Sequence, residues 1–244
     1  MKKSLKVFMS VLCLCPLLLL AGCEKPASYK ITAMPSDSIL GYVQGAYNNE
    51  QKTEGSKITL VARENSPETN PFICWVKDYK KVASTSKSLP LTYNKSTAGS
   101  YTAVYAENSH TQMMFATLSK VSFETEQYTT INYEILTTGG TSGSENSSSF
   151  AAGSFSASEE YKTDLDSILY FGNVNTNYDF RLQVKLKLLN SQNAETTYDI
   201  PLMPSINRAS FDDTGTAVIN LDIPVLYSSI TLTFEKLNST MYAS

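Results

Sequence analysis

Apolar and polar positions alternate with a period of two through most of the chain. The clearest stretch is residues 180–188, in which Phe, Leu and Val alternate with Arg, Gln and Lys. Successive side chains of a β-strand point to opposite faces, so this stretch predicts a strand with one buried face and one cationic, solvated face. The same alternation predicts further strands at residues 58–62, 89–93, 101–105, 131–135, 217–223 and 230–234.

Turn and helix signals divide these strands. Residues 191–194 predict a turn that joins the strand at 180–188 to residues 196–202 as a hairpin. Pro224 would end the strand before it, because proline has no N–H for the ladder. The one helical signal is a capping-box spacing of Ser156 and Glu159, which predicts one or two helical turns between residues 156 and 171. The chain is therefore expected to be all-β.

Two polar stretches bear on domain organisation. Residues 137–149 are rich in Gly, Ser and Thr, and we interpret them as a flexible loop within a sheet rather than a linker. The polar stretch at residues 107–111 is the better domain boundary. We predict two small β domains, residues 29–107 and 111–244, the second being an immunoglobulin-like or jelly-roll β-sandwich.

The N-terminal segment follows the order of an export signal. Three lysines within the first six residues precede an apolar run over residues 7–21, which is shorter than the roughly 20 residues needed to span a bilayer. The run ends in Leu20-Ala21-Gly22-Cys23, which resembles the lipobox of bacterial lipoproteins. That resemblance implies cleavage after residue 22 and diacylation of Cys23. The alternative is an ordinary signal peptide that contains a cysteine.

A lipidated Cys23 would fix the location of the protein. Two acyl chains, at about 0.8 kcal/mol per buried methylene, anchor a protein firmly on a membrane surface. Residues 1–22 would be a signal peptide and residues 23–28 a short tether. We expect an extracytoplasmic protein anchored by palmitate-type lipid to the cell membrane or outer membrane of a bacterium.

The charge balance bears on partners. The whole sequence has a formal charge of −3, and the signal segment takes away three lysines and no acidic residue. A mildly acidic mature chain without basic runs gives no electrostatic footprint for nucleic acid. The low charged fraction of 18%, with 15 Tyr and 10 Phe, is typical of a secreted β protein.

Few residues carry candidate chemistry. After processing, Cys74 is the only cysteine besides Cys23, and its apolar setting at residues 72–76 predicts a buried structural thiol. The single histidine, His110, lies in a polar stretch and is interpreted as a solvated linker residue. The acidic clusters at residues 164–166 and 212–215 lack the spacing of an EF-hand and are interpreted as turns or helix ends. No catalytic residue, metal site or cofactor is predicted.

A series of strand and turn segments follows between residues 29 and 107: Gly55 before residues 58–62, Phe72-Ile73-Cys74-Trp75, Val82-Ala83-Ser84-Thr85, Leu89 to Tyr93, and Tyr101-Thr102-Ala103-Val104-Tyr105. In order and spacing these segments resemble the internalin-B-type repeat module of bacterial surface proteins. The resemblance implies a small β-rich unit used for spacing or contact at a cell surface, and it brings no catalytic residues.

These observations favour a non-catalytic surface module that binds a glycan or surface protein or serves a structural role. Trp75, the sole tryptophan, is the one candidate ligand-binding residue, as a platform on which a sugar would stack, although the repeat pattern favours packing. An envelope or transport-associated ligand-binding lipoprotein is the alternative. A carboxylate-dependent hydrolase requires only two placed acids, and no pair is indicated.

Overall fold

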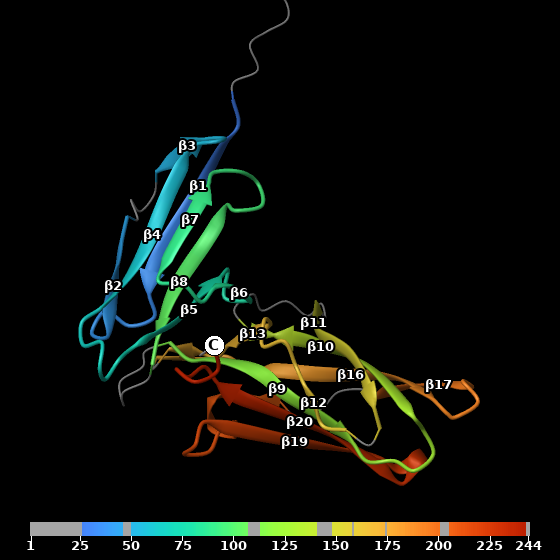
Figure 1. Ribbon diagram of the computed structural model, residues 1–244. Helices are drawn as coiled ribbons and strands as arrows, with labels where there is room; N and C mark the ends of the chain where they lie inside the picture. The colour runs from blue at the N-terminus through green and yellow to red at the C-terminus, as the bar shows by residue number, and fades with distance from the viewer. Residues whose placement is uncertain are drawn as a thin grey trace, which may run out of the picture.

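The computed structural model describes residues 26–45, 50–106, 113–140, 148–157, 159–173, 175–200 and 205–242 (Figure 1). The fold is all-β, as predicted, and the described helices are the single 3-10 turns η2 (Arg208–Ser210) and η3 (Pro224–Leu226). Within these described ranges, no helix has the length and apolar character needed to cross a membrane.

The first part of the chain forms a sandwich of two sheets. One sheet has the order β3-β1-β8-β5-β6 and the other β2-β4-β7. Their strands are β1 (Ser28–Pro35), β2 (Gly41–Gln44), β3 (Gln51–Thr53), β4 (Lys57–Glu64), β5 (Phe72–Lys77), β6 (Lys81–Ser84), β7 (Ser88–Thr92) and β8 (Gly99–Tyr105). The neighbours are antiparallel except β1 and β8, which run parallel. Leu60, Trp75 and Tyr105 are fully buried between the two sheets.

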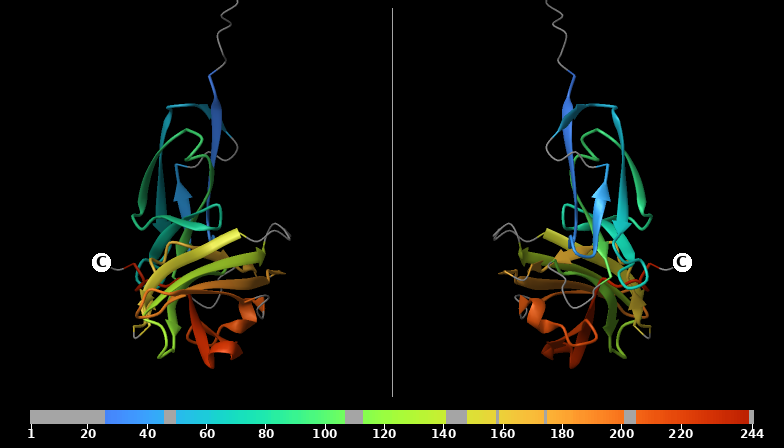
Figure 2. Two further views of the ribbon diagram at one scale, coloured as in Figure 1. Left: turned by 90° about the vertical axis from the view of Figure 1, so that its right-hand side faces the viewer. Right: turned by 90° about the vertical axis from the view of Figure 1, so that its left-hand side faces the viewer.

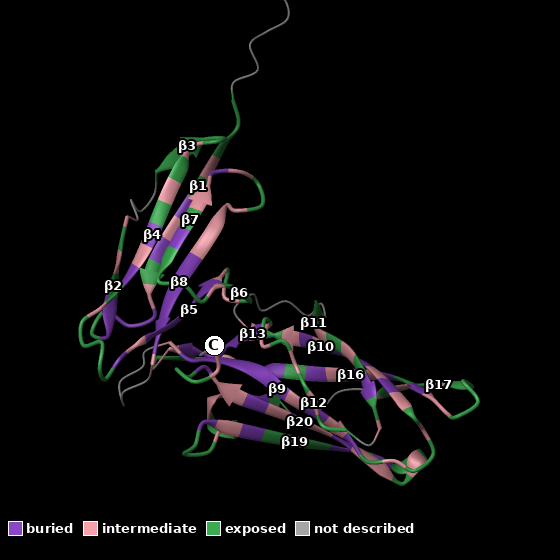
Figure 3. Ribbon diagram, in the orientation of Figure 1, coloured by how far each residue is buried: buried purple, intermediate pink, exposed green. Residues whose placement is uncertain are grey.

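The second part is a larger sandwich. One sheet has the order β12-β9-β20-β19, with β13 also paired to β9, and the other β11-β10-β16-β17, with β18 paired to β16. Their strands are β9 (Phe115–Phe123), β10 (Thr130–Gly139), β11 (Ser148–Ser156), β12 (Tyr161–Lys162), β13 (Ile168–Tyr170), β16 (Phe180–Leu189), β17 (Glu195–Ile200), β18 (Ser205–Ile206), β19 (Thr216–Ile223) and β20 (Ser228–Lys236). A small hairpin, β14 (Gly172–Asn173) and β15 (Thr176–Asn177), completes it. Figures 2 and 3 show the two layers and the buried positions between them.

Most predicted strands are confirmed. In β16 the apolar residues at positions 180, 182, 184, 186 and 188 are buried and the polar ones between them are half-buried or exposed, as period-two alternation requires. β16 and β17 pair as the predicted hairpin, and β19 ends where Pro224 begins η3. Of the stretch at 137–149, residues 137–139 belong to β10 and residues 148 and 149 to β11, and these two strands pair in one sheet. The expected boundary at residues 107–111 lies outside the described residues.

The helix expected between residues 156 and 171 is wrong. The amide of Glu159 donates to the carbonyl of Ser156 at 3.0 Å in a single turn. The chain then pairs with β9 through β12 and β13, and the amide of Thr163 donates to Ser119 at 3.1 Å. Leu165 has a φ of +56°, which ends any helical path. Pairing with the edge of β9 gives this segment more backbone hydrogen bonds than one or two isolated helical turns would, because so short a helix is only marginally stable.

An apolar junction joins the two sandwiches (Figure 1). Residues 72–76 are buried on both faces of β5, because Phe72 and Trp75 face the first core while Ile73, Cys74 and Val76 face the second sandwich. The second sandwich contributes Phe115, Ile168, Tyr170 and Leu237.

Backbone hydrogen bonds reinforce this junction. The amide of Val82 donates to Asp166 at 2.9 Å, and the amide of Ile168 donates to Lys80 at 2.8 Å. These bonds bring β6 of the first sandwich beside the segment that leads into β13 of the second. The two sandwiches therefore contact each other through both side chains and main chain.

Cys74 should resist alkylation while the protein is folded. Burial raises the pKa of the Cys74 thiol to about 12, so the reactive thiolate is scarce at neutral pH and also shielded. Iodoacetamide treatment at pH 8, followed by mass spectrometry of the peptide that contains Cys74, should find modification only after unfolding in guanidinium. Rapid labelling of the folded protein would mean that the junction opens readily.

Candidate functional site

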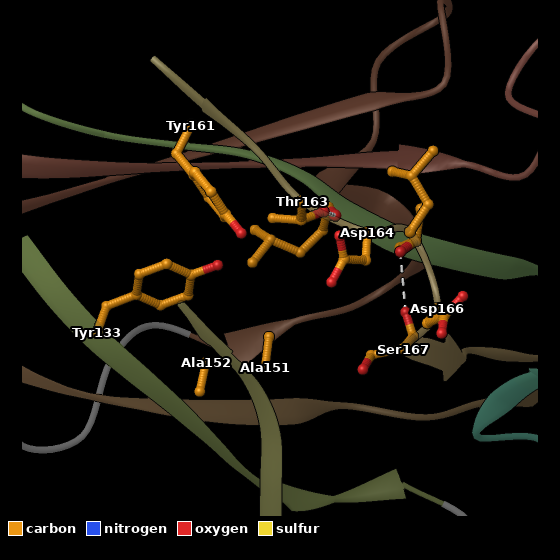
Figure 4. A pocket seen from close by; sticks show the side chains of 11 residues that line it. Tyr133, Ala151, Ala152, Tyr161, Thr163, Asp164, Asp166 and Ser167 are labelled. Carbon is orange, nitrogen blue, oxygen red and sulfur yellow. Dashed lines mark hydrogen bonds between the residues drawn. The ribbon is translucent and has the colours of Figure 1, made fainter. Parts of the chain in front are cut away.

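A cavity of about 100 Å³ opens at one side of the second sandwich, between the two sheets (Figure 4). One wall comes from β10 and β11, and the other comes from β9 and the segment that contains β12 and leads into β13. Its lining residues are Thr117, Leu118, Tyr133, Ala151, Ala152, Tyr161, Thr163, Asp164, Leu165, Asp166 and Ser167.

Tyr133 is the most enclosed aromatic residue of the cavity wall. It occupies an inward position of β10 and is only 4 % exposed. Its ring meets those of Phe155 and Tyr161 edge-on, with centroids 6.1 and 6.0 Å apart. Gly153 lies opposite on β11, and a Cβ there would come within 2.7 Å of the Tyr133 ring. A glycine at this position is what gives the ring its space.

The hydroxyl groups of Tyr133 and Tyr161 point into the cavity and toward each other (Figure 4). Among the described residues, the Tyr133 hydroxyl forms no hydrogen bond (Figure 4). Burial raises the pKa of Tyr133, and the neighbouring Tyr161 hydroxyl and Asp164 carboxylate raise it further. All three causes penalise a negative charge on this oxygen.

The rim is a turn over residues 164–166, fixed in place from several directions. The Thr163 hydroxyl donates to the Leu118 carbonyl, and the Thr117 hydroxyl donates to the Ser167 carbonyl at 2.9 Å. From the C-terminal end of the chain, the Tyr242 hydroxyl donates to the Leu165 carbonyl at 2.9 Å. The prediction of a turn at this acidic cluster is confirmed, but the turn also borders a cavity.

The cavity limits which chemistry fits. Pockets for whole small molecules measure about 300–1,000 Å³, so this cavity suits the end of a chain rather than a free metabolite. Asp164 and Asp166 project from one turn (Figure 4), whereas glycoside hydrolysis uses two carboxylates that flank the bond from separate positions. The two aspartates do not have that flanking arrangement.

Trp75 is in the core of the first sandwich, so the interpretation as a sugar-stacking platform is wrong for the folded protein. Its exposure is 0 %, and its indole N–H donates to the Ser86 carbonyl at 3.1 Å. Its ring lies 5.8 Å from that of Phe72. No face of the indole reaches solvent, so packing is the role that the structure supports.

The other sequence-predicted residues lie apart from the cavity. Cys74 is buried at the junction, as expected. The Asp212 carboxylate accepts hydrogen bonds from the amides of Thr214 and Thr216, both at 2.9 Å, and Gly215 has a φ of +83°, which confirms a turn. Within the part of the chain that the structure describes, no three His, Cys, Asp or Glu side chains converge as metal ligands. Cys23 and His110 lie outside the described residues.

Sequence reasoning missed the cavity. Tyr133 lies within the strand predicted at residues 131–135, and Tyr161 lies within the stretch predicted to hold one or two helical turns, so the sequence points to neither as a site residue. The sequence signal that would have pointed here is the run of small residues Ala151-Ala152-Gly153, which leaves room beside a large aromatic residue on the neighbouring strand.

Searches of protein-family models, curated proteins and solved structures give no significant match to this chain.

Proposed function

We propose that this chain is a lipid-anchored, extracytoplasmic bacterial protein without catalytic activity. In this proposal Cys23 carries the lipid, the first sandwich is a spacer, and the second sandwich is the part held out to meet a glycan or protein partner. The resemblance of residues 29–107 to a surface-repeat module supports the spacer role.

The proposal rests mainly on how close Cys23 must lie to the first sandwich and how far it must lie from the second. β1 begins at Ser28, and residues 23–28 can span at most roughly 18 Å. The eight-residue β1 then covers about 26 Å at 3.3 Å per residue. The start of β1 and the second sandwich lie at opposite ends of the first sandwich (Figure 1). An anchor at Cys23 would therefore keep the first sandwich near the membrane and the second away from it.

The junction supports the same role. The first sandwich can act as a spacer only if it is joined firmly to the second. Here the two sandwiches share a buried apolar cluster and two backbone hydrogen bonds. The alternative of a ligand-binding transport lipoprotein gains no support from the cavity, which is below the usual size of a nutrient site.

Metabolic labelling with palmitate in a bacterial host tests the anchor. The wild-type chain should incorporate label and partition into the detergent phase of a Triton X-114 extract, because its lipid is bound through the Cys23 sulfur. Cys23→Ser should incorporate no label, since serine lacks the thiol that accepts the diacylglyceryl group.

Cys15→Ser is the matched control, because it makes the same substitution within the segment expected to be cleaved. It should be labelled like the wild type. Equal labelling of Cys23→Ser and the wild type, or no labelling of either, would contradict the proposed anchor.

A further inference from the structure

The cavity of the second sandwich offers oxygen atoms and negative charge to whatever enters it. The carboxylates of Asp164 and Asp166 are exposed at its rim, and neither forms an ion pair with a described residue. On the adjoining strand β9, Lys120 is paired with Glu160 at 3.1 Å, so its charge is already compensated. Unpaired carboxylates beside a narrow cavity attract a cation and repel an anion.

The Tyr133 hydroxyl gives a second, independent indication of a ligand. It is attached to a nearly buried ring, it points into the cavity, and it has no hydrogen-bond partner among the described residues (Figure 4). The ring is held by the core while the hydroxyl oxygen opens to the cavity, so this hydroxyl is free to accept a hydrogen bond from a donor that enters. The raised pKa of Tyr133 agrees with a site that disfavours negative charge.

We infer that the cavity binds a primary ammonium group at the end of an unbranched alkyl chain, either a lysine side chain of a partner protein or a free amine. An ammonium group has three N–H donors. The Asp164 carboxylate and the hydroxyls of Tyr133 and Tyr161 are three acceptor groups, one for each N–H donor. The two tyrosine rings also offer faces that attract a cation. The alkyl stem lies against Leu118, Ala151 and Ala152.

Other ligand classes fit less well. A sugar ring or nucleotide exceeds the volume of about 100 Å³, and a phosphate or carboxylate would be repelled by the two aspartates. Calcium takes six to eight oxygen ligands, whereas no cluster of three acidic, histidine or cysteine side chains forms in the described ranges. The inference concerns the second sandwich alone and does not depend on lipidation of Cys23.

Isothermal titration calorimetry with n-butylammonium chloride tests this inference on the full chain in detergent micelles. The wild-type protein should give saturable binding, whereas 1-butanol, which has the same length but no charge, should give none. Asp164→Asn and Tyr133→Phe should each weaken binding by at least about tenfold, because the first removes the negative charge that faces the ammonium group and the second removes a hydrogen-bond acceptor for it.

Asp213→Asn is the matched control, since it removes the same charge from an exposed turn outside the cavity, and it should bind like the wild type. Asp164 is exposed, so Asp164→Asn keeps the test valid even if Tyr133→Phe destabilises the core. The inference is overturned if the wild type shows no saturable binding, if 1-butanol binds equally well, or if Asp164→Asn and Asp213→Asn bind alike.

A second titration distinguishes the two sources of the ammonium group. The peptide acetyl-Gly-Lys-Gly-amide should bind at least as tightly as n-butylammonium if the natural ligand is a partner's lysine. Binding of n-butylammonium with exclusion of the peptide would support a free amine. Calcium chloride should not compete with either ligand, and full competition by calcium would replace the inference with a metal site.

Discussion

Trp75→Ala should destabilise the first sandwich by about 3–5 kcal/mol, the range for removing a fully buried tryptophan. The change deletes a ring that packs on Phe72 and leaves the Ser86 carbonyl without its indole donor. Domains unfold with free energies of only about 5–15 kcal/mol, so this loss is a large share of the total. Urea unfolding followed by far-UV circular dichroism measures it.

Trp75→Phe is the matched variant, because it keeps an aromatic ring and loses less volume, and it should cost clearly less than the alanine change. The result also decides between the two roles considered for Trp75. A loss below about 1 kcal/mol, which is typical of surface positions, together with reduced glycan binding would mean that Trp75 works at a surface after all.

Phe115→Ala should uncouple the two sandwiches. Phe115 lies at the start of β9, where its ring contacts Tyr170 at 5.1 Å and Tyr79 of the first sandwich at 6.4 Å between centroids. Deleting a buried phenylalanine costs about 3–5 kcal/mol, and here part of that cost falls on contacts between the sandwiches. The junction should then no longer transmit the unfolding of one sandwich to the other.

Two spectroscopic probes separate the sandwiches in that experiment. Trp75 is the only tryptophan and lies in the first core, so its fluorescence reports the first sandwich, whereas circular dichroism reports both. In the wild type the two urea transitions should coincide, and in Phe115→Ala they should separate. Tyr227→Ala, at a side chain that is 99 % exposed, should leave both midpoints unchanged. Coincident transitions at the wild-type midpoint in Phe115→Ala would contradict a coupling junction.

The sequence predicted strands well wherever one face is buried and the other is wet. The period-two pattern of residues 180–188 is sufficient to place β16, and the patterns at 217–223 and 230–234 place β19 and β20. The helix prediction at residues 156–171 is wrong because β12 and β13 are too short to show a period-two pattern, and they form only by pairing with β9. A local capping signal cannot report a partner strand some 40 residues away.

The candidate site was less predictable than the fold. Its residues come from β9, β10, β11 and the segment from β12 to β13, and only the stacking of two sheets brings them together. Asp164 and Asp166 are turn residues, as the sequence predicts. The turn becomes part of a candidate site only because Tyr133, on a strand of the other sheet, lines the same cavity. Burial of Trp75, in contrast, agrees with the packing role that the resemblance to the repeat module implies.

In the proposed arrangement, Cys23 anchors the first sandwich to a membrane as a spacer and the second sandwich is displayed beyond it. Intact-mass spectrometry of the protein extracted from bacterial membranes tests this anchor. We expect a chain that begins at Cys23 and carries the added mass of a diacylglyceryl group. A chain that begins at Met1, or at an unmodified residue after cleavage, would rule the anchor out.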